Sequence, residues 1–418
     1  MEGGVSRAET GLDRGRLISS ICVSMFFVGL SMGTFLSLLP LYALHLGASY
    51  VDLGLIGAVW SVSYTVFPPL VGMMTDRFGR RRFMLTGMGC FILSPALYLL
   101  ASSVWHVIVI QAVNGAVQAF IWPVAQAFLV DITAPGERTR VMSRYSSSWI
   151  LGTLIGPAIG GFVLQNYGFI ALFTLSSTLA ALGFVTFLPA SSEARRFERR
   201  GHVLCGLTQA FRDSAAILLH PIYIAIMSYS VAVSLIYNIF PAYVKALGAN
   251  AFQIGILFTV FGVVRTLSSW RSEGVRSGRE GMLVVSTLTV QGVSLIMMAY
   301  PRNFTPFLAL TASIGFSVGT ITPLTLSILS KTVPEERAGL AMGMAESVVG
   351  AGWIIGPLVG GAIAQYVGPS HPYTVFGVVT LLMIPVILLR GLKLPKKTAT
   401  VGSGVVAGGG FEPPTSGL

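Results

Sequence analysis

Twelve long apolar runs follow one another along this chain of 418 residues, with short polar segments between them. A helix needs roughly 20 apolar residues to cross about 30 Å of hydrocarbon. A segment in lipid must also satisfy its backbone hydrogen bonds internally, so runs of this length predict helices and not barrel strands. We place the spans at 17–46, 51–75, 83–102, 104–131, 141–166, 169–189, 218–245, 251–270, 282–300, 304–331, 338–367 and 372–390.

Charged side chains are too scarce for a water-soluble protein of this length. They make up 10% of the residues, and hydrophobic side chains make up 53%, whereas a soluble domain carries about 25% charged residues. The net charge of +11 comes from short clusters between apolar runs and not from a basic stripe, so we expect no nucleic-acid partner. The three cysteines show no C-x-x-C spacing, and we expect no metal and no cofactor.

The positions of Lys and Arg set an orientation in the membrane. If the N-terminus is cytoplasmic, 23 of the 27 basic residues fall in cytoplasmic tails and loops, as the positive-inside rule requires. Arg144 and Arg265 lie just inside spans near that face, and only Lys245 and Arg302 lie outside. We therefore expect a multi-pass protein of the cell membrane with both termini in the cytoplasm.

The two halves of the chain repeat at an offset of about 200 residues, and Gln165 matches Gln365 in this repeat. A motif of the fifth span returns in the eleventh: Gly152, Gly156, Pro157, Gly160 and Gly161 match Gly352, Gly356, Pro357, Gly360 and Gly361. The domains that we expect are a cytoplasmic tail at 1–16, six-helix bundles at 17–189 and 218–391, a cytoplasmic linker at 190–217 and a disordered tail at 392–418. Parallel repeats predict a pathway between the halves, near the middle of the membrane.

The loop between the second and third spans carries a motif that plain clustering of arginines does not explain. It contains Gly72, Asp76, Arg77, Gly79, Arg80, Arg81 and Arg82. We expect Gly72 to admit a neighbouring helix and Gly79 to allow a tight turn. Asp76 is suited to a helix N-terminus of the other half, where a carboxylate is favoured by about 0.3–1 kcal/mol. Asp131, at the cytoplasmic end of the fourth span, is the expected partner of the arginines.

These motifs resemble the major facilitator superfamily over essentially residues 15–392, and the Gly152–Gly161 segment resembles the fifth-helix motif of its drug and solute exporters. The resemblance implies an all-α membrane fold of twelve helices in two pseudo-symmetric bundles. It also implies that Asp76 and its arginines form a gate that is latched when the transporter faces outward. The glycine–proline motif would permit close packing and bending of the fifth helix.

The sequence departs from the family pattern at two places. The second-half counterpart of the loop motif has Arg271 and Val275 where Gly72 and Asp76 stand, so the latch should be one-sided. On the fourth span, the stretch from Gln111 to Gly115 lacks the arginine that the family often carries there. That arginine is commonly linked to proton coupling, and its absence argues against ordinary proton antiport.

The resemblance implies that the first, fourth, seventh and tenth helices line a substrate cavity. Five polar or aromatic side chains recur on one face of the fourth span: Gln111, Asn114, Gln118, Trp122 and Gln126. The seventh span offers Ser234, Tyr237 and Asn238. A stripe of amides is costly toward lipid, so it should face a wet cavity. Small polar residues in such helices serve equally well as interhelical hydrogen-bonding groups, and that alternative stays open.

Glu346 is the one acidic residue that we place well inside a span. An unpaired charge at that depth costs about 2.5–3.5 kcal/mol, so we expect Glu346 to be protonated or paired with Arg265 or Arg144. Either it couples transport to an ion, or it belongs to a buried structural ion pair. The chain has no phosphate-binding G-x-x-x-x-G-K-[ST] loop, so an ion or substrate gradient must supply any driving force.

Together these observations predict a monomeric secondary transporter, not an enzyme, that moves small organic solutes by alternating access. Export of hydrophobic or drug-like compounds, with protons as the coupling ion, is the interpretation that the fifth-helix motif favours. A permease for sugars or other neutral metabolites is the alternative that the amide stripe favours. A non-transporting membrane receptor would be favoured by a large soluble appendage, which this sequence does not contain.

Overall fold

The computed structural model describes residues 2–194, 221–272, 279–332 and 338–390. The expected C-terminal tail at 392–418 lies outside these residues, and so does most of the expected linker at 190–217. Throughout the described part of the chain the regular structure is helical, with no strand. The predicted all-α fold class is therefore confirmed.

The first half of the chain folds into a bundle of long helices joined by short turns. Its elements are α1 (Glu2–Leu36), α2 (Leu39–His45), α3 (Tyr50–Phe78), α4 (Arg80–Leu99), α5 (Val104–Ala119), α6 (Trp122–Ile132), a 3₁₀ turn η1 (Pro135–Glu137) and α7 (Arg138–Ala194). Gly168 interrupts α7 with a φ of +78°. It stands between the expected spans 141–166 and 169–189, so α7 is two helices joined at a sharp bend.

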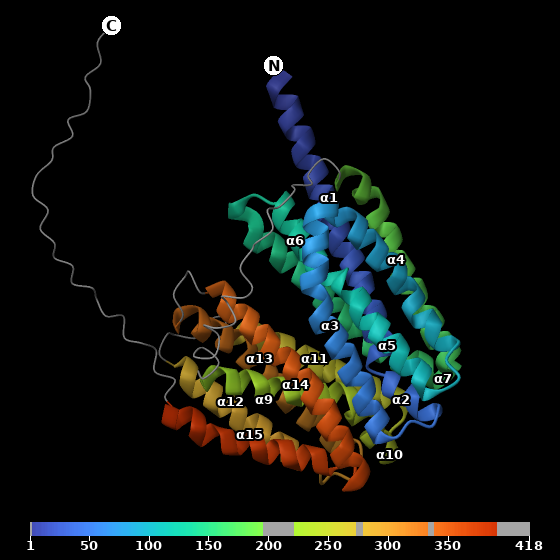
Figure 1. The fold of residues 1–418 in the computed structure, drawn as a ribbon, viewed down its shortest axis with the longest axis vertical. Coiled ribbons are helices and arrows are strands. Elements are labelled where there is room, and N and C mark those ends of the chain that lie inside the picture. Colours follow the sequence, from blue (N-terminus) through green and yellow to red (C-terminus); the bar gives the residue numbers. More distant parts are fainter. Residues whose placement is uncertain (1, 195–220, 273–278, 333–337, 391–418) are drawn as a thin grey trace, which may run out of the picture.

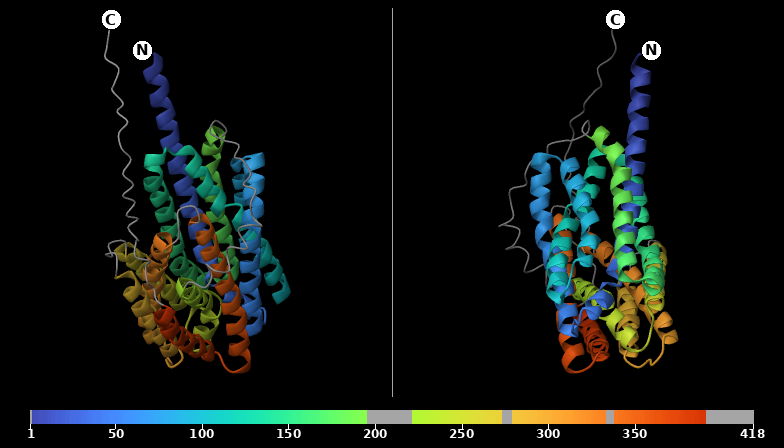
Figure 2. Two further views of the ribbon diagram at one scale, coloured as in Figure 1. Left: turned by 60° about the vertical axis from the view of Figure 1, so that its left-hand side comes forward. Right: turned by 90° about the vertical axis from the view of Figure 1, so that its right-hand side faces the viewer.

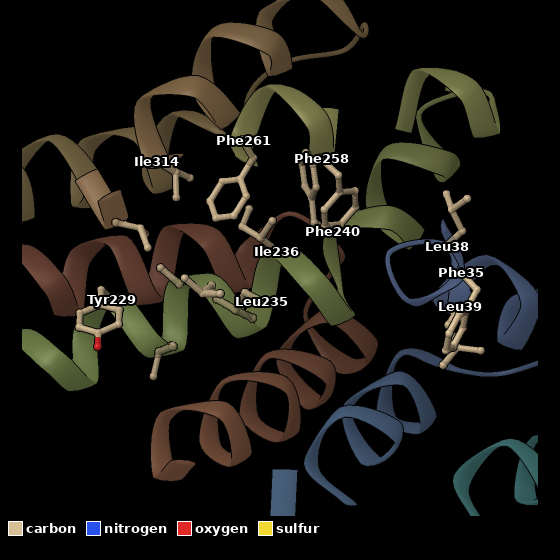
Figure 3. Packing of buried hydrophobic residues seen from close by; sticks show 14 of the residues in the cluster. Phe35, Leu38, Leu39, Tyr229, Leu235, Ile236, Phe240, Phe258, Phe261 and Ile314 are labelled. Atoms are coloured by element: carbon tan, nitrogen blue, oxygen red, sulfur yellow. The ribbon is translucent and has the colours of Figure 1, made fainter. Parts of the chain in front are cut away.

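The second half forms a similar bundle, and a large apolar core lies within it. Its elements are α9 (Pro221–Asn238), α10 (Phe240–Ala246), α11 (Ala251–Ser272), α12 (Glu280–Met297), α13 (Thr305–Thr332), α14 (Ala338–Tyr366) and α15 (His371–Arg390). Figure 3 shows part of this core, which includes Leu235 and Ile236 of α9 and Phe258 and Phe261 of α11. Because these side chains are 3% exposed or less, they pack the helices of this half into one body.

Eleven helical stretches of the described chain are long and apolar enough to cross a membrane. One of them, Arg140–Leu188, has 49 residues and contains the bend at Gly168. About 20 residues suffice for one crossing, so this stretch is long enough for two of the twelve expected spans.

Three of the expected spans are broken near the middle or the end of their length. The run at 17–46 divides into α1 and α2, the run at 104–131 into α5 and α6, and the run at 218–245 into α9 and α10. The second helix of each pair has a proline in its first turn. Proline lacks a backbone N–H and has its φ fixed, so it starts a helix well and continues one badly.

The two bundles meet at one end of the molecule and diverge toward the other (Figure 1). The end where they meet contains α2 and α10, and we call it the opposite end. The other end, called here the basic end, carries the α3–α4 turn with its arginines and the last turn of α13 with Lys331. Two further views show the first-half helices standing side by side above the more tilted helices of the second half (Figure 2).

Candidate functional site

A cavity of about 820 Å³ lies between the two halves. Its wall draws on α1 to α7 of the first half and on α9, α11 and α14 of the second. Within the described residues α13 contributes nothing to this wall, although the family resemblance implied that the tenth span, which is α13, would line the cavity. The second-half wall comes from α14 instead, because α14 packs directly against α3 across the interface.

Aromatic side chains from both halves form a continuous part of the cavity wall. Trp60 of α3 stacks on Tyr64 with ring centroids 5.2 Å apart. Its indole also lies 5.7 Å from Trp353 of α14, which in turn lies 5.7 Å from Tyr237 of α9. All four residues line the cavity. The contact between Trp60 and Trp353 therefore joins the two halves at the cavity itself.

The amide stripe of the fourth span is divided between the cavity and the protein interior. Gln111, Gln118, Trp122 and Gln126 line the cavity. Asn114 is fully buried, does not line it, and donates its Nδ2 to Gln111 Oε1 at 3.1 Å. The hydroxyl of Tyr98 donates to the same oxygen at 3.1 Å. Asn114 therefore holds the Gln111 amide in place from behind and is not available to a ligand in this conformation.

The three candidate residues of the seventh span likewise separate into two groups. Tyr237 and Asn238 line the cavity. Ser234 does not; it is fully buried and donates its hydroxyl to the carbonyls of Val231 at 2.8 Å and Gly352 at 3.2 Å. Its hydroxyl is used in packing α9 against α14, so its expected place at the cavity is wrong for this structure.

Glu346 of α14 and Arg265 of α11 both line the cavity. Among the described residues no ion pair within 4 Å joins them, and Glu346 is exposed. Arg144 does not line the cavity and donates to Ser19 Oγ at 3.4 Å. The expected pairing of Glu346 with either arginine is therefore not formed. An open cavity supplies the physical reason, since water can solvate the carboxylate there.

At the basic end, the α3–α4 turn is built around Gly79, whose φ is +92°. Arg80 Nη1 lies 2.8 Å from Asp131 Oδ2 and so joins α4 to α6. The guanidinium carbon of Arg77 lies 5.4 Å from the ring centroid of Phe78. Arg82 is exposed and Arg81 is half-buried. The side chain of Asp76 lies outside the described residues.

Gly72 does not admit a neighbouring helix in this conformation, contrary to our expectation. A Cβ atom built on Gly72 would meet nothing within 4 Å, and the same is true of Gly343 on α14. Gly72 lies near the end of α3 and Gly343 near the start of α14, and the two bundles diverge toward the basic end (Figure 1). Gly72 therefore faces open space in this conformation.

A second ion pair at the basic end repeats the Arg80–Asp131 pair with the charges exchanged. Lys331 Nζ of α13 lies 2.5 Å from Glu280 Oε1 of α12, and the Ser327 hydroxyl donates to the same oxygen at 3.1 Å. Glu280 and Lys331 each stand 200 residues beyond their counterparts Arg80 and Asp131. Sequence reasoning missed this pair, although the repeat offset, applied to charged positions, would have found it.

The glycines of the repeated motif bring helices into backbone contact within each half. Gly152, Gly156 and Gly160 face α1, and a Cβ on Gly160 would lie 2.0 Å from the Thr34 carbonyl oxygen. In the second half Gly352, Gly356 and Gly360 face α9. Any larger residue at Gly160 would collide with a backbone that cannot move aside, so glycine sets the helix separation there.

The same motif also makes the two contacts between halves that we call the glycine seams. In the first, a Cβ on Gly161 of α7 would lie 2.6 Å from the Ala251 carbonyl oxygen of α11. In the second, a Cβ on Gly361 of α14 would lie 2.4 Å from the Tyr50 carbonyl oxygen of α3. Both seams lie near the starts of α3 and α11, close to α2 and α10. They join the two halves at the opposite end of the molecule.

Comparison with known proteins agrees with this arrangement. The model of the Major Facilitator Superfamily matches residues 21–272 and 222–409. Multidrug resistance protein 2 of Bacillus subtilis is 25% identical over 358 residues, which cover 83% of this chain and 87% of that protein. A multi-drug resistance efflux pump PmrA homolog of Lactococcus lactis is 25% identical over 357 residues, covering 82% and 87%. Multidrug resistance protein MdtG of Salmonella paratyphi A is 25% identical over 384 residues, covering 87% and 92%.

The family match extends over both halves of the chain, and the helical bundles with a cavity between them fit the same assignment. The relatives are matched over most of their own length as well. The resemblance noted in the loop and fifth-helix motifs is confirmed: this chain belongs to the Major Facilitator Superfamily and is a membrane transporter of small molecules, not an enzyme.

Proposed function

We propose that this transporter exports hydrophobic or drug-like organic compounds from the cytoplasm by alternating access. It would act as a monomer in the cell membrane with both termini and the basic end in the cytoplasm. The observation that carries the proposal is the aromatic wall of the cavity, formed by Trp60, Tyr64, Tyr237 and Trp353. The names of the relatives as multidrug resistance proteins support it.

The size and chemistry of the cavity suit such solutes. Ligand pockets commonly enclose about 300–1,000 Å³ and combine apolar walls with a few polar groups, and this cavity encloses about 820 Å³. Its rings offer broad apolar faces on which flat or amphipathic molecules can stack. The amides of Gln111, Gln118 and Gln126 add hydrogen-bonding groups along one side.

The conformation fits a cytoplasm-facing state of the transport cycle. The glycine seams close the opposite end, and the halves diverge at the basic end (Figure 1). In the outward-facing state the basic end would close, and Gly72 and Asp76 would then approach the second half. We assign Asp76, Arg77, Gly79 and the Arg80–Arg82 cluster with Asp131 to this gate, and the Arg80–Asp131 pair would hold the gate in shape within its own half.

Glu346 is the group that we propose for coupling to protons. It lies on the cavity wall, where both water and substrate can reach it. A carboxylate in that place can take up a proton from one side of the membrane and release it to the other as access alternates. Arg265 lies on the same wall, and we assign it with Glu346 to the coupling site.

Transport in inside-out vesicles tests the proposal. With an imposed proton gradient, the wild-type protein should accumulate a lipophilic fluorescent dye. Glu346→Gln should abolish gradient-driven accumulation and leave dye counterflow intact. Ser347→Ala is the matched control, because Ser347 also lines the cavity but donates its hydroxyl to Gly343 in its own helix. Arg144→Gln should also leave accumulation unchanged, because Arg144 does not line the cavity.

Two outcomes would contradict the proposal. In the first, the protein accumulates no dye from a broad lipophilic panel but shows counterflow of a neutral sugar. This result would favour the permease that the amide stripe suggests. If Glu346→Gln unfolds at a much lower temperature than Ser347→Ala and loses counterflow as well, Glu346 has a structural role and not a coupling role.

A further inference from the structure

Two helices of the opposite end, α3 and α11, begin with the same arrangement of side chains. At the start of α3, Ser49 Oγ accepts from the Asp52 N–H at 3.2 Å and Asp52 Oδ2 accepts from the Ser49 N–H at 2.8 Å. At the start of α11, Asn250 Oδ1 accepts from the Gln253 N–H at 2.8 Å, and Gln253 Oε1 accepts from the Asn250 N–H at 2.9 Å. Each is a reciprocal capping box.

A capping box satisfies only two of the free N–H groups at a helix start. It leaves the N–H of the first helical residue, here Tyr50 or Ala251, for another acceptor. In both helices that acceptor comes from the other half of the protein. Gln365 Oε1 accepts from the Tyr50 N–H at 3.1 Å, and Gln165 Oε1 accepts from the Ala251 N–H at 3.2 Å.

The two glutamines occupy equivalent places in the repeat. Gln165 follows Gly161 by four residues and Gln365 follows Gly361 by four residues, so each lies one helical turn beyond the glycine of its seam. The close backbone approach at that glycine brings the glutamine within reach of the helix start across the interface. Each seam therefore consists of a glycine contact and one hydrogen bond to an otherwise unpaired helix N–H.

We infer that Gln165 and Gln365 are paired latches that hold the opposite end of the transporter closed. They are positioning residues that touch no substrate, and the inference rests on the proposed alternating access. When the opposite end opens, both hydrogen bonds must break together, because each joins a helix of one half to a helix of the other. One neutral hydrogen bond of this kind shifts an equilibrium by about two- to tenfold.

Access of a thiol reagent to the cavity from outside measures the opening without any transported substrate. Ser37 is 1% exposed and lines the cavity near α2, so Ser37→Cys gives a small change at a suitable place. Cys22, Cys90 and Cys205 would be replaced by alanine. In right-side-out vesicles, a membrane-impermeant maleimide should modify Ser37→Cys at a rate proportional to the population open at that end.

Gln165→Met should raise this rate about two- to tenfold. The double variant, Gln165→Met with Gln365→Met, should raise it by about the product of the two single-variant factors. Gln165→Glu should leave the rate unchanged or lower it, because a carboxylate keeps the acceptor and is favoured at a helix N-terminus. Asn166→Ala is the matched control, since the hydrogen bond of Asn166 among the described residues runs to the Phe162 carbonyl of its own helix, at 2.8 Å.

The latch is refuted if the double variant leaves the rate unchanged, or if Gln165→Glu accelerates modification as much as Gln165→Met. Failure of the proposed function gives a different result. If modification occurs only in inside-out vesicles, in the wild type and in every variant, the protein does not open at the opposite end at all, and both the latch and alternating access are wrong. If only the dye assay fails, the modification rates still test the latch.

Discussion

Replacing Gly361 by alanine should open the opposite end of the transporter without unfolding it. The added Cβ would lie 2.4 Å from the Tyr50 carbonyl oxygen and 3.2 Å from the Gly54 Cα. An ordinary contact begins near 3.4 Å, so α14 and α3 must separate by about 1 Å at this point. Both obstacles are backbone atoms of the other half, which no rotamer change can remove.

The magnitude follows from the cost of overpacking. Forcing extra volume into a tight contact costs about 1–3 kcal/mol, which corresponds to about 5–150-fold in an equilibrium. In the proposed cycle, the outward-open state would relieve the clash and the cytoplasm-facing state would not, so the whole cost would shift the balance between them. The maleimide modification rate of Ser37→Cys from outside should rise by that factor.

Gly360→Ala supplies the control on the neighbouring residue. Its added Cβ would lie 2.3 Å from Leu235 Cδ2, the far end of a flexible side chain in the same half, and its other contacts are at 3.7 Å or more. Modification of this variant should stay within about threefold of the wild type, because Leu235 belongs to the same half, so the cost of repacking it falls on both states alike. Equal rates for the two variants would show that the seam does not control the opening.

Two further predictions concern the ion pairs and the aromatic wall. Lys331→Met should destabilise the protein by about 3–5 kcal/mol, because it removes the cation beside the Glu280 carboxylate, whose side chain is only 4% exposed. Asp131→Asn should destabilise it by about 1 kcal/mol, because the Arg80–Asp131 pair is partly exposed to solvent. Thermal unfolding in detergent would rank the two, and Glu280→Gln added to Lys331→Met should restore part of the loss. Trp353→Ala removes ring contacts to Trp60 and Tyr237 and should weaken dye binding about 2–12-fold. Trp270→Ala, at a site 58% exposed and outside the cavity, should leave the affinity unchanged, and equal losses in both would contradict the assignment.

Features that depend on local sequence were predictable. Apolar length and the repeat predicted the helices, and the repeated glycines predicted where helices approach closely. The breaks before α2, α6 and α10 were missed, although the proline in the first turn of each carried the signal.

Features that depend on how the halves dock could not be predicted in the same way. Ser234 has the kind of small polar side chain that is expected at a cavity. Its hydroxyl instead donates to the Gly352 carbonyl, because α14 packs against α9 there. Glu346 was expected to be protonated or paired with an arginine; its side chain is exposed at the cavity, and the pairing is not formed. The hydrogen bonds of Gln165 and Gln365 cross between halves whose relative position no periodicity reveals.

In the orientation that we propose, the glycine seams face the outer side of the membrane, so their chemistry decides how the closed end responds to the medium there. Their contacts join carbonyl groups, glycines and neutral amides, none of which carries a net charge or titrates near neutral pH. Salt screens interactions between charges and leaves such contacts nearly untouched. Closure of the seams should therefore hold in dilute, saline or mildly acid surroundings alike. The basic end, with its arginines and carboxylates, stands in the cytoplasm of our proposal, where the cell itself regulates ionic strength.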